Sequence, residues 1–208
     1  MKLMELTLSD YLAELRSESP APGGGSVSAL AGAQGMSLLM MVCGLTITRE
    51  KYAEHHETCR KALEKAEAIG RELADLVDLD TEAYLGVAAA FKLPKETDEE
   101  KGARSAAIIK ATHTATEIPY RVMELSLAGL ELAGELMDKT NPNAASDLGV
   151  AGQNLSAALK GAYYNVLINL SGLKDQSAEE TFRDTGMKMV ERGTLLLTII
   201  EDHTEKHL

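Results

Sequence analysis

The sequence predicts an all-α protein, a multihelical up-and-down bundle of long helices. Hydrophobic residues make up 45% of the 208 residues, yet there is no Trp and only two Phe, so the apolar content is mainly Ala, Leu, Val, Ile and Met. Five prolines interrupt the chain, and the stretches between them are rich in the helix formers Ala, Leu, Glu and Lys. This length fits one domain over residues 1–208. Because long, partly apolar helices commonly complete their core by pairing, we expect a homodimer.

Charge and cysteine content exclude several classes of protein. A net charge of −11 argues against a nucleic-acid partner, since no basic face is available to neutralise phosphates. Cys43 and Cys59 both lie in helical pattern without the spacing of a disulfide framework, which favours a reduced, cytoplasmic setting. The uncharged segment from Val27 to Thr48 is long enough to span a bilayer, but polar residues and glycines dilute it. We therefore expect a buried helix and no membrane partner.

Capping and breaking residues place the helices in order. Thr7, with Asp10 three residues later, predicts a short capped helix that ends near Arg16. A turn over residues 20–25 follows, and the uncharged helix then runs to Thr48.

Four further helices are expected. One runs over 51–91 and ends at Lys92-Leu93-Pro94-Lys95. Thr97 and Glu100 form a predicted capping box for the next helix, which Pro119 is expected to kink or split. Asn141-Pro142-Asn143 is a turn, and the last two helices run over 144–170 and from about Ala178 nearly to the C-terminus.

The glycine-rich turn before the uncharged helix is a candidate binding site. Gly23, Gly24 and Gly25 follow Pro22, and Ser26 follows them. Glycines let backbone N–H groups approach a ligand, Ser26 can cap the helix, and the helix dipole favours negative charge there. Such a turn binds an anion or stabilises a developing one. Close packing of two helices explains the same glycines equally well.

Asp80 interrupts the apolar stripe of the 51–91 helix. It falls in angle between Val77 and Tyr84, whereas Asp78 points nearly the opposite way. We therefore expect Asp80 to be buried and Asp78 to be solvated. A carboxylate on an apolar face is costly unless it is paired, and burial raises its pKa towards that of a general acid or base. A structural ion pair or hydrogen bond between helices is the alternative, which spacing alone slightly favours. The stripe consists of Ala66, Ile69, Leu73, Leu76, Val77, Ala83, Tyr84, Val87 and Phe91.

The 144–170 helix carries a stripe of small and hydrogen-bonding residues. Asparagine is a poor helix former and needs a partner for its amide inside a helix. The stripe either lines a polar cleft or packs closely while its amides tie helices together, and both can hold at once. Its members are Asp147, Ala151, Asn154, Ala158, Ala162, Asn165 and Asn169.

No metal site is expected. His55 and Cys59 are one turn apart, but two ligands do not make a zinc site. His203 and His207 have the same spacing near the C-terminus, where histidine suits the helix dipole.

Several ordered motifs resemble the cyclodeaminase/cyclohydrolase family of folate enzymes. This family comprises the C-terminal half of formiminotransferase-cyclodeaminase and free-standing bacterial methenyltetrahydrofolate cyclohydrolases. The resemblance spans almost the whole chain, with one departure at Thr48, where relatives often carry glycine. The motifs are Ala21-Pro22-Gly23-Gly24-Gly25-Ser26, Leu45-Thr46 to Lys51-Tyr52, Asp80-Thr81-Glu82-Ala83-Tyr84, Lys92-Leu93-Pro94-Lys95, Ser146-Asp147-Leu148, and Gly161-Ala162-Tyr163 with Asn165-Val166-Leu167-Ile168-Asn169-Leu170.

The resemblance implies an all-helical homodimer that acts on a tetrahydrofolate derivative, without a metal or another cofactor. An aspartate in the segment over 78–80 is regarded as catalytic in the family. The helical phase independently selects Asp80, and Asp78 is the second choice. Asp147 is then the natural second carboxylate, holding the partner of Asp80 or binding the pterin amino group.

Other residues are candidates for binding the substrate. The turn of Gly23, Gly24, Gly25 and Ser26 would orient it, and Asn165 and Asn169 would bond pterin edges. Lys92 and Lys95 would meet the carboxylates of the glutamate tail.

The preferred reaction is hydrolysis of 5,10-methenyltetrahydrofolate to 10-formyltetrahydrofolate, because free-standing members are usually associated with this step. The alternative is cyclodeamination of 5-formiminotetrahydrofolate with release of ammonia. A non-catalytic, folate-binding helical subunit is a third reading. Two carboxylates that break the helical pattern argue against it, because such groups are costly to retain in a mere scaffold.

Overall fold

The computed structural model describes residues 2–208, which form six α-helices and three short 3-10 helices without a strand. This confirms the all-α prediction. The elements are η1 (Leu3–Glu5), α1 (Leu8–Leu15), α2 (Gly24–Ile47), η2 (Glu50–His55), α3 (His56–Phe91), α4 (Asp98–Leu136), η3 (Pro142–Ala144), α5 (Ala145–Leu170) and α6 (Gln176–Glu205).

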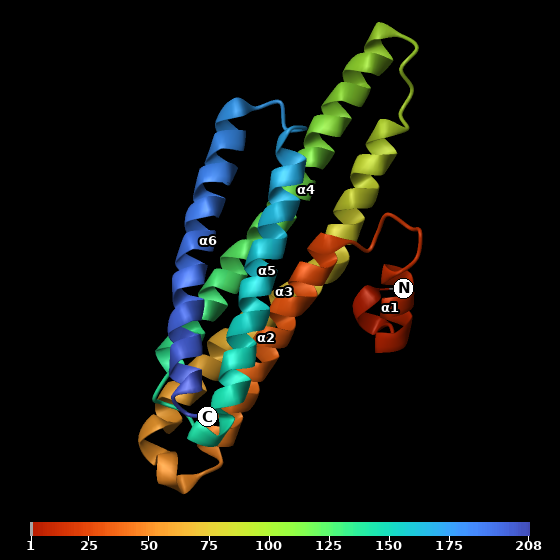
Figure 1. The fold of residues 1–208 in the computed structure, drawn as a ribbon. Helices are drawn as coiled ribbons and strands as arrows, with labels where there is room; N and C mark the ends of the chain where they lie inside the picture. Colours follow the sequence, from red (N-terminus) through yellow and green to blue (C-terminus); the bar gives the residue numbers. More distant parts are fainter. Residues whose placement is uncertain (1) are drawn as a thin grey trace.

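The long helices run up and down beside one another, as short connections require (Figure 1). α2 packs against α3 and α5, and α4 packs against the same two helices. α6 covers α5 and α4 on the outside, and α1 lies to one side of the bundle. α3 and α4 continue beyond the N-terminal end of α2 as a projecting pair (Figure 1). The first turn of α2 therefore lies at the base of the projecting pair (Figure 1).

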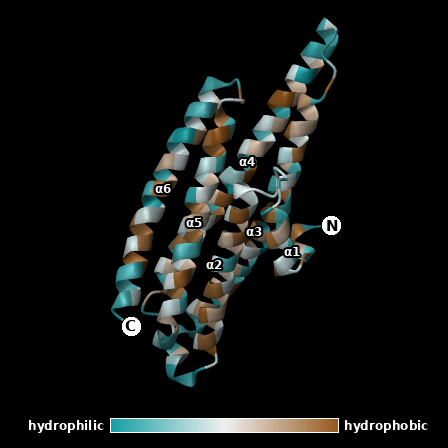
Figure 2. Cartoon of the chain, turned by 45° about the vertical axis from the view of Figure 1, so that its right-hand side comes forward, coloured by the Kyte–Doolittle hydropathy of each residue, from teal (hydrophilic) through white to brown (hydrophobic). Residues whose placement is uncertain are grey.

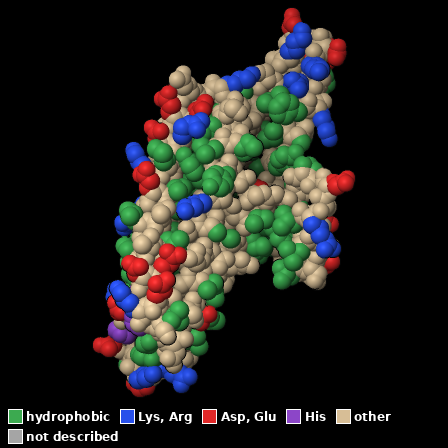
Figure 3. Space-filling view, in the orientation of Figure 1, with side chains coloured by type: hydrophobic (Ala, Val, Ile, Leu, Met, Phe, Trp, Pro, Cys, Tyr) green, Lys and Arg blue, Asp and Glu red, His purple; other side chains and the backbone are tan. Residues whose placement is uncertain are grey.

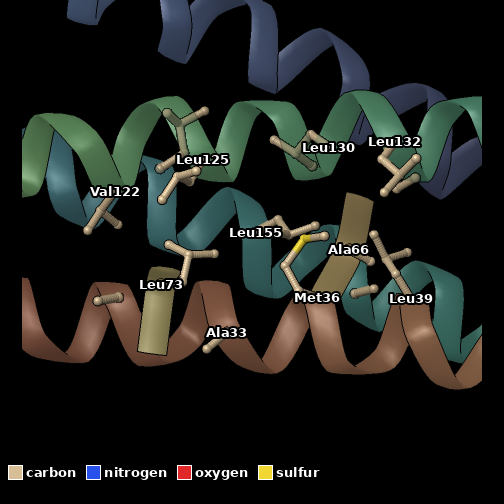
Figure 4. Packing of buried hydrophobic residues seen from close by; sticks show 14 of the residues in the cluster. Ala33, Met36, Leu39, Ala66, Leu73, Val122, Leu125, Leu130, Leu132 and Leu155 are labelled. Atoms are coloured by element: carbon tan, nitrogen blue, oxygen red, sulfur yellow. The ribbon is translucent and has the colours of Figure 1, made fainter. Parts of the chain in front are cut away.

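The core is built from leucine and methionine side chains of α2, α3, α4 and α5 (Figure 4). Met36 of α2, Leu73 of α3 and Leu155 of α5 are completely buried there. Gly35 lets α2 approach α5, because a Cβ at this position would lie 2.7 Å from Cγ of Leu155. Hydrophilic residues gather at the two ends of the bundle, as Figure 2 shows. Among residues 2–208, α2 is the one helix whose length and hydropathy suffice to cross a membrane.

The predicted caps are confirmed. Thr7 accepts a hydrogen bond from the backbone N–H of Asp10 at 3.2 Å and begins α1. At α4 the N–H of Glu100 donates to Thr97 Oγ1 at 3.2 Å, and the N–H of Thr97 donates to Glu100 Oε2 at 3.1 Å. These paired bonds satisfy two orphan donors of the first turn.

The expectation of one helix over 51–91 is wrong at its start. η2 occupies Glu50–His55, and the backbone of Tyr52 is not helical, with φ −113° and ψ 23°. The Tyr52 hydroxyl donates to Asn141 Oδ1 at 2.9 Å, on the turn before α5. This long-range contact orients the separate segment between α2 and α3.

Pro119 does not split its helix. α4 is continuous from Asp98 to Leu136 although Pro119 lacks the N–H that would bond the carbonyl of Ala115. The side-chain amide of Asn169 on α5 donates to this carbonyl at 2.8 Å. The bond that proline removes is thus replaced from a neighbouring helix, which lets α4 continue.

The apolar stripe of α3 is buried only in part. Ala66, Leu73 and Val77 are in the core, but Tyr84 and Phe91 are 41% and 54% exposed. The expectation that all share a buried face is wrong because the last turns of α3 belong to the projecting pair, beyond the end of α2.

Candidate functional site

Asp80 lies on α3 where the N-terminus of α2 meets that helix. The backbone N–H of Ser26 donates to Asp80 Oδ2 at 2.9 Å. Ser26 is in the first turn of α2, where N–H groups have no partner inside the helix. The carboxylate therefore caps α2 from a neighbouring helix and faces the positive end of its dipole.

Ser26 orients the carboxylate instead of capping its own helix. The cap residue of α2 is Gly23, so the expectation that Ser26 caps α2 is wrong. The Ser26 side chain is completely buried, and its hydroxyl donates to the carbonyl of Val77 at 2.8 Å. The same oxygen lies 3.3 Å from Asp80 Oδ2 and 3.1 Å from Thr81 Oγ1. One serine thus binds two consecutive turns of α3.

The predicted turn over residues 20–25 is too long at its end, because α2 begins at Gly24. Gly24 and Gly25, in the first turn of α2, allow two close approaches. A Cβ at Gly25 would lie only 2.0 Å from Asp80 Oδ1, so the carboxylate rests directly on the backbone of this residue. A Cβ at Gly24 would lie 3.2 Å from Nδ2 of Asn165 on α5. Gly23 has no comparable neighbour, since its nearest atom, the carbonyl oxygen of Pro20, is at 3.7 Å. Close packing of α2 against α3 and α5 therefore explains Gly25 and Gly24.

The environment of Asp80 makes it a candidate base. Burial raises the pKa of its carboxyl above the ordinary value, and the hydrogen bonds from Ser26 act in the opposite direction without cancelling the effect. Among residues 2–208, no basic side chain forms an ion pair with it. The residue is half-buried, so solvent still reaches it. A partly desolvated carboxylate without a cation can accept a proton or attract a cationic substrate.

Tyr11 joins the site unexpectedly. It is the one buried residue of α1, with 6% of its surface exposed. Its hydroxyl has no hydrogen-bond partner within residues 2–208. Burial, and secondarily the charge of Asp80, raise the pKa of this phenol. Sequence reasoning missed Tyr11 because a single aromatic residue on a short helix forms no motif; the inward-facing side of α1 was the available signal.

Asp78 has a different hydrogen-bond partner from Asp80. It is half-buried, contrary to the expectation that it is solvated, and it accepts a hydrogen bond from the backbone N–H of Leu3. Asp78 thereby ties η1 to α3. Its carboxylate is engaged with the N-terminal segment and not with the turn before α2.

Asp147 is not brought to Asp80 within one chain. It lies in the first turn of α5, whereas Asn165, next to Gly24, lies near the end of that helix. At 1.5 Å per residue the two positions on α5 are separated by roughly 27 Å. Any contact between Asp147 and the Asp80 site would need another chain.

The two asparagines have different surroundings. Asn165 donates to the carbonyl of Gly161 at 2.8 Å and borders the glycine turn through Gly24. Asn169 donates to the carbonyl that Pro119 leaves free, so its amide serves the fold. The alanines of the same stripe, Ala151, Ala158 and Ala162, are completely buried. Close packing therefore explains most of this stripe, and only its Asn165 end borders the site.

Lys92 and Lys95 are exposed beyond the end of α3, at the tip of the projecting pair. Between Asp80 and this tip, α3 and α4 enclose a mainly apolar groove of about 550 Å³. Lys110 and Glu82 are its charged lining residues. Figure 3 shows a separate indentation of the surface between α1 and the projecting pair. Asp80 does not line the groove itself, but its neighbour Leu79 does.

Comparisons with known proteins identify the family of the chain. The sequence profile described as formiminotransferase-cyclodeaminase matches residues 7–187. A methenyltetrahydrofolate cyclohydrolase of Methylorubrum extorquens is 40% identical over 196 residues, which cover 94% of each chain. The formimidoyltransferase-cyclodeaminase of Rattus norvegicus is 34% identical over 181 residues, which cover 87% of this chain and 34% of that protein.

A solved structure shows the same fold. The crystal structure of formiminotetrahydrofolate cyclodeaminase from Thermotoga maritima superposes with a TM-score of 0.80 and 26% identity. The superposition covers 100% of this chain and 98% of that one. The chain therefore belongs to the formiminotransferase-cyclodeaminase family.

Proposed function

We propose that the protein is a methenyltetrahydrofolate cyclohydrolase, which hydrolyses 5,10-methenyltetrahydrofolate to 10-formyltetrahydrofolate. The observation that carries this proposal is the half-buried Asp80 carboxylate, held on Gly25 and Ser26 with a raised pKa and without a cation. The substrate is a cyclic amidinium cation, which an unpaired carboxylate attracts. The near end-to-end match to a relative of this name supports the choice.

In the first step, Asp80 acts as a general base. A water molecule attacks the methenyl carbon, its oxygen forms the new C–O bond, and the carboxylate takes one of its protons. The C=N π electrons move to nitrogen, which neutralises the amidinium. The product is a tetrahedral carbon that carries a hydroxyl and bridges N5 and N10.

In the second step, Asp80 acts as a general acid. Its carboxyl returns the proton to N5 as the bond between N5 and the bridging carbon breaks. The hydroxyl proton leaves to solvent, and the C=O bond of the formyl group forms on N10. The overall reaction consumes one water and releases one proton. It needs no oxidant or reductant, and we propose no cofactor besides the folate.

The groove lined by Leu79, the residue before Asp80, provides room for part of the substrate. In this proposal the pterin lies over the glycine turn, where Asn165 can bond its edge. The apolar groove between α3 and α4 takes the benzoyl part, and Lys110 meets a carboxylate of the glutamate tail. Lys92 and Lys95 lie farther along the same direction and suit a longer tail.

Cyclodeamination of 5-formiminotetrahydrofolate is the second candidate. The Rattus norvegicus and Thermotoga maritima relatives carry cyclodeaminase names. N10 would attack the formimino carbon, which gives a similar tetrahedral centre, and ammonia would leave. The same carboxylate can move the protons of both reactions.

A paired assay separates these functions. We expect the purified protein to remove the absorbance of 5,10-methenyltetrahydrofolate faster than the uncatalysed rate. We expect no release of ammonia from 5-formiminotetrahydrofolate. Ammonia release without methenyl hydrolysis would reverse the assignment. Tight folate binding without turnover of either substrate would show a non-catalytic folate-binding subunit.

We also propose that the protein forms a homodimer through the outer faces of α2 and α5. Residues 27, 31, 34, 38, 41 and 45 of α2 and 150, 154, 157, 161, 164 and 168 of α5 form two adjacent stripes without a charged side chain. The stripes include Val27, Met41, Tyr164 and Ile168, which are exposed large hydrophobic residues. Figure 3 shows charged side chains mainly around the edges of this side. A face of this kind favours a second copy.

Sedimentation equilibrium tests the dimer. We expect twice the chain mass of 22.3 kDa for the unmodified protein, and dissociation for Met41→Lys, which places a charge in the face. Leu195→Lys is the control, since Leu195 is 61% exposed on α6, outside the two stripes. A monomer at every concentration would refute the proposal.

A further inference from the structure

Two histidines and an aspartate converge at the end of the bundle opposite the glycine turn. His203 and His207 lie one turn apart at the end of α6, and Asp138 lies in the connection after α4. One potential ligand atom from each residue lies within 4.8 Å of the other two. Asp138 Oδ1 is 3.6 Å from His203 Nδ1 and 3.9 Å from His207 Nε2.

These distances are close to those of a metal site. Zinc–nitrogen and zinc–oxygen bonds of about 2.0–2.1 Å place neighbouring ligand atoms of a tetrahedral site about 3.3 Å apart. The separations of Asp138 Oδ1 from the two histidine nitrogens exceed this value by about 0.3 and 0.6 Å, and all three ligand atoms lie within 4.8 Å of one another. Rotation of exposed side chains can close such a gap, and Asp138 and His207 are both exposed.

The orientation of His207 is a second, independent observation. Its Nδ1 lies 2.8 Å from the backbone carbonyl oxygen of His203, an atom that can only accept a hydrogen bond. Nδ1 therefore carries the proton, and in the neutral ring Nε2 presents its lone pair towards Asp138. Metal-binding histidines are typically oriented in this way, with the second ring nitrogen bonded to a carbonyl.

The surroundings keep the site accessible. A small hollow of about 110 Å³ beside the cluster is lined by Asn141, Pro142 and Ala145 and leaves room for water as a further ligand. A second hollow is lined by the three residues of the cluster together with Asp202 and Lys206, so the negative charge of Asp202 favours cation binding at the cluster and the positive charge of Lys206 opposes it.

We propose that Asp138, His203 and His207 bind one divalent transition-metal ion, with Zn²⁺ as the best match to two imidazole nitrogens and one carboxylate oxygen. This revises the expectation that the histidine pair only complements the helix dipole. Sequence reasoning saw the histidine spacing but had no means to bring Asp138, 65 residues earlier, beside it.

The ion would join two parts of the chain that are distant in sequence. It would fix the end of α6 to the connection between α4 and α5. The ion would have a structural role. The cluster and Asp80 lie at opposite ends of α2, which is about 36 Å long, so the ion would be too far from Asp80 to take part in the reaction. Thr46, near the other end of α2, already accepts a hydrogen bond at 2.9 Å from the N–H of Asn141, which lines the hollow.

Metal titration of the full chain, without an affinity tag and after removal of metals with a chelator, tests the proposal. Co²⁺ serves as the spectroscopic probe, since its visible absorption reports tetrahedral nitrogen and oxygen ligands, and calorimetry measures Zn²⁺ binding. We expect one ion per chain and at least about tenfold weaker binding for Asp138→Asn and for His207→Ala. Asn tolerates the positive φ of 59° at residue 138, so the first variant keeps the turn.

His113→Ala is the matched control, because His113 is an exposed histidine on α4 that pairs with Glu117. This variant should bind the metal like the unmodified chain. Zn²⁺ should raise the melting temperature of the unmodified chain more than that of Asp138→Asn at the same Zn²⁺ concentration. Folate turnover should be the same in both proteins. Absence of stoichiometric binding, or binding that neither Asp138→Asn nor His207→Ala weakens, would refute the site and leave ordinary pairing of Asp138 with the histidines.

Discussion

Asp80→Asn should lose methenyl hydrolysis by about 100- to 10,000-fold while the chain still folds and binds folate. The Asn side chain has nearly the same shape, and its oxygen can still accept the Ser26 N–H. It cannot accept a proton from water, nor attract the amidinium as a charge does. Steady-state kinetics measure the loss, and fluorescence titration with a folate measures the binding that should remain.

Stability gives no reason to expect unfolding of this variant. Burial raises the pKa of Asp80 in the folded state. The contribution of Asp80 to the free energy of unfolding is therefore greatest when the carboxyl is protonated. This contribution falls as the pH rises from the ordinary pKa of 3.8 through the raised pKa of the folded state. At neutral pH the uncharged Asn removes the unfavourable desolvation of a carboxylate. Thermal unfolding at pH 7 should show a melting temperature at least equal to that of the unmodified chain.

The pH profile distinguishes a proton shuttle from a purely structural residue. In the unmodified protein, kcat/KM should fall on acidification through a pKa above 3.8, because the free carboxylate is the active form. That limb should disappear in Asp80→Asn. Asp75→Asn, an exposed aspartate of α3, is the control and should keep rate and profile. If Asp78→Asn removes turnover and Asp80→Asn does not, Asp78 is the reactive group instead.

Gly25→Ala should abolish most activity and destabilise the fold by about 1–3 kcal/mol. The new methyl group would lie 2.0 Å from Asp80 Oδ1, a separation that no rotation of a methyl group relieves. Either the carboxylate leaves the end of α2 or α2 moves away from α3. A displacement of about 1 Å in a reactive group lowers turnover on the order of 100-fold.

The matched control lies in the same helix. A Cβ at Gly44 would meet nothing within 4 Å, so Gly44→Ala should be neutral or stabilise α2 by about 0.5–1 kcal/mol. Chemical denaturation and the methenyl assay compare the two variants. Equal behaviour of Gly25→Ala and Gly44→Ala would show that the close approach at Gly25 is unimportant.

Local chemistry made most of the fold predictable. Capping at Thr7 and Thr97 and the turn at Pro142 involve residues within one or two turns, so they can be recognised from spacing alone. The continuity of α4 could not be predicted in this way. It depends on Asn169, which is 54 residues from the carbonyl it satisfies. Proline normally interrupts a helix for local reasons, but here the distant Asn169 side chain supplies the missing hydrogen bond.

The same distinction applies to the site. Helical phase placed Asp80 and Asp78 on different sides of α3, and their carboxylates do have different partners. The predicted contrast in burial is wrong, because both residues are half-buried. The glycines pointed to a close approach but not to the atom that approaches. The position of Asp147 depends on the direction in which α5 runs beside α2, which spacing within α5 does not reveal. The cap that Asp80 provides for α2 likewise joins residues 54 positions apart.

The replacement of one missing backbone bond by the Asn169 amide has a mechanical consequence. The Asn169 bond lets α4 remain one continuous helix from the core to the tip of the projecting pair. The wall of the groove that carries Lys110 is then held at a constant separation from the carboxylate on α3. A side chain without a hydrogen-bond donor at position 169 would leave α4 free to bend at Pro119. The distance between the Asp80 carboxylate and Lys110 would then vary from one molecule to the next.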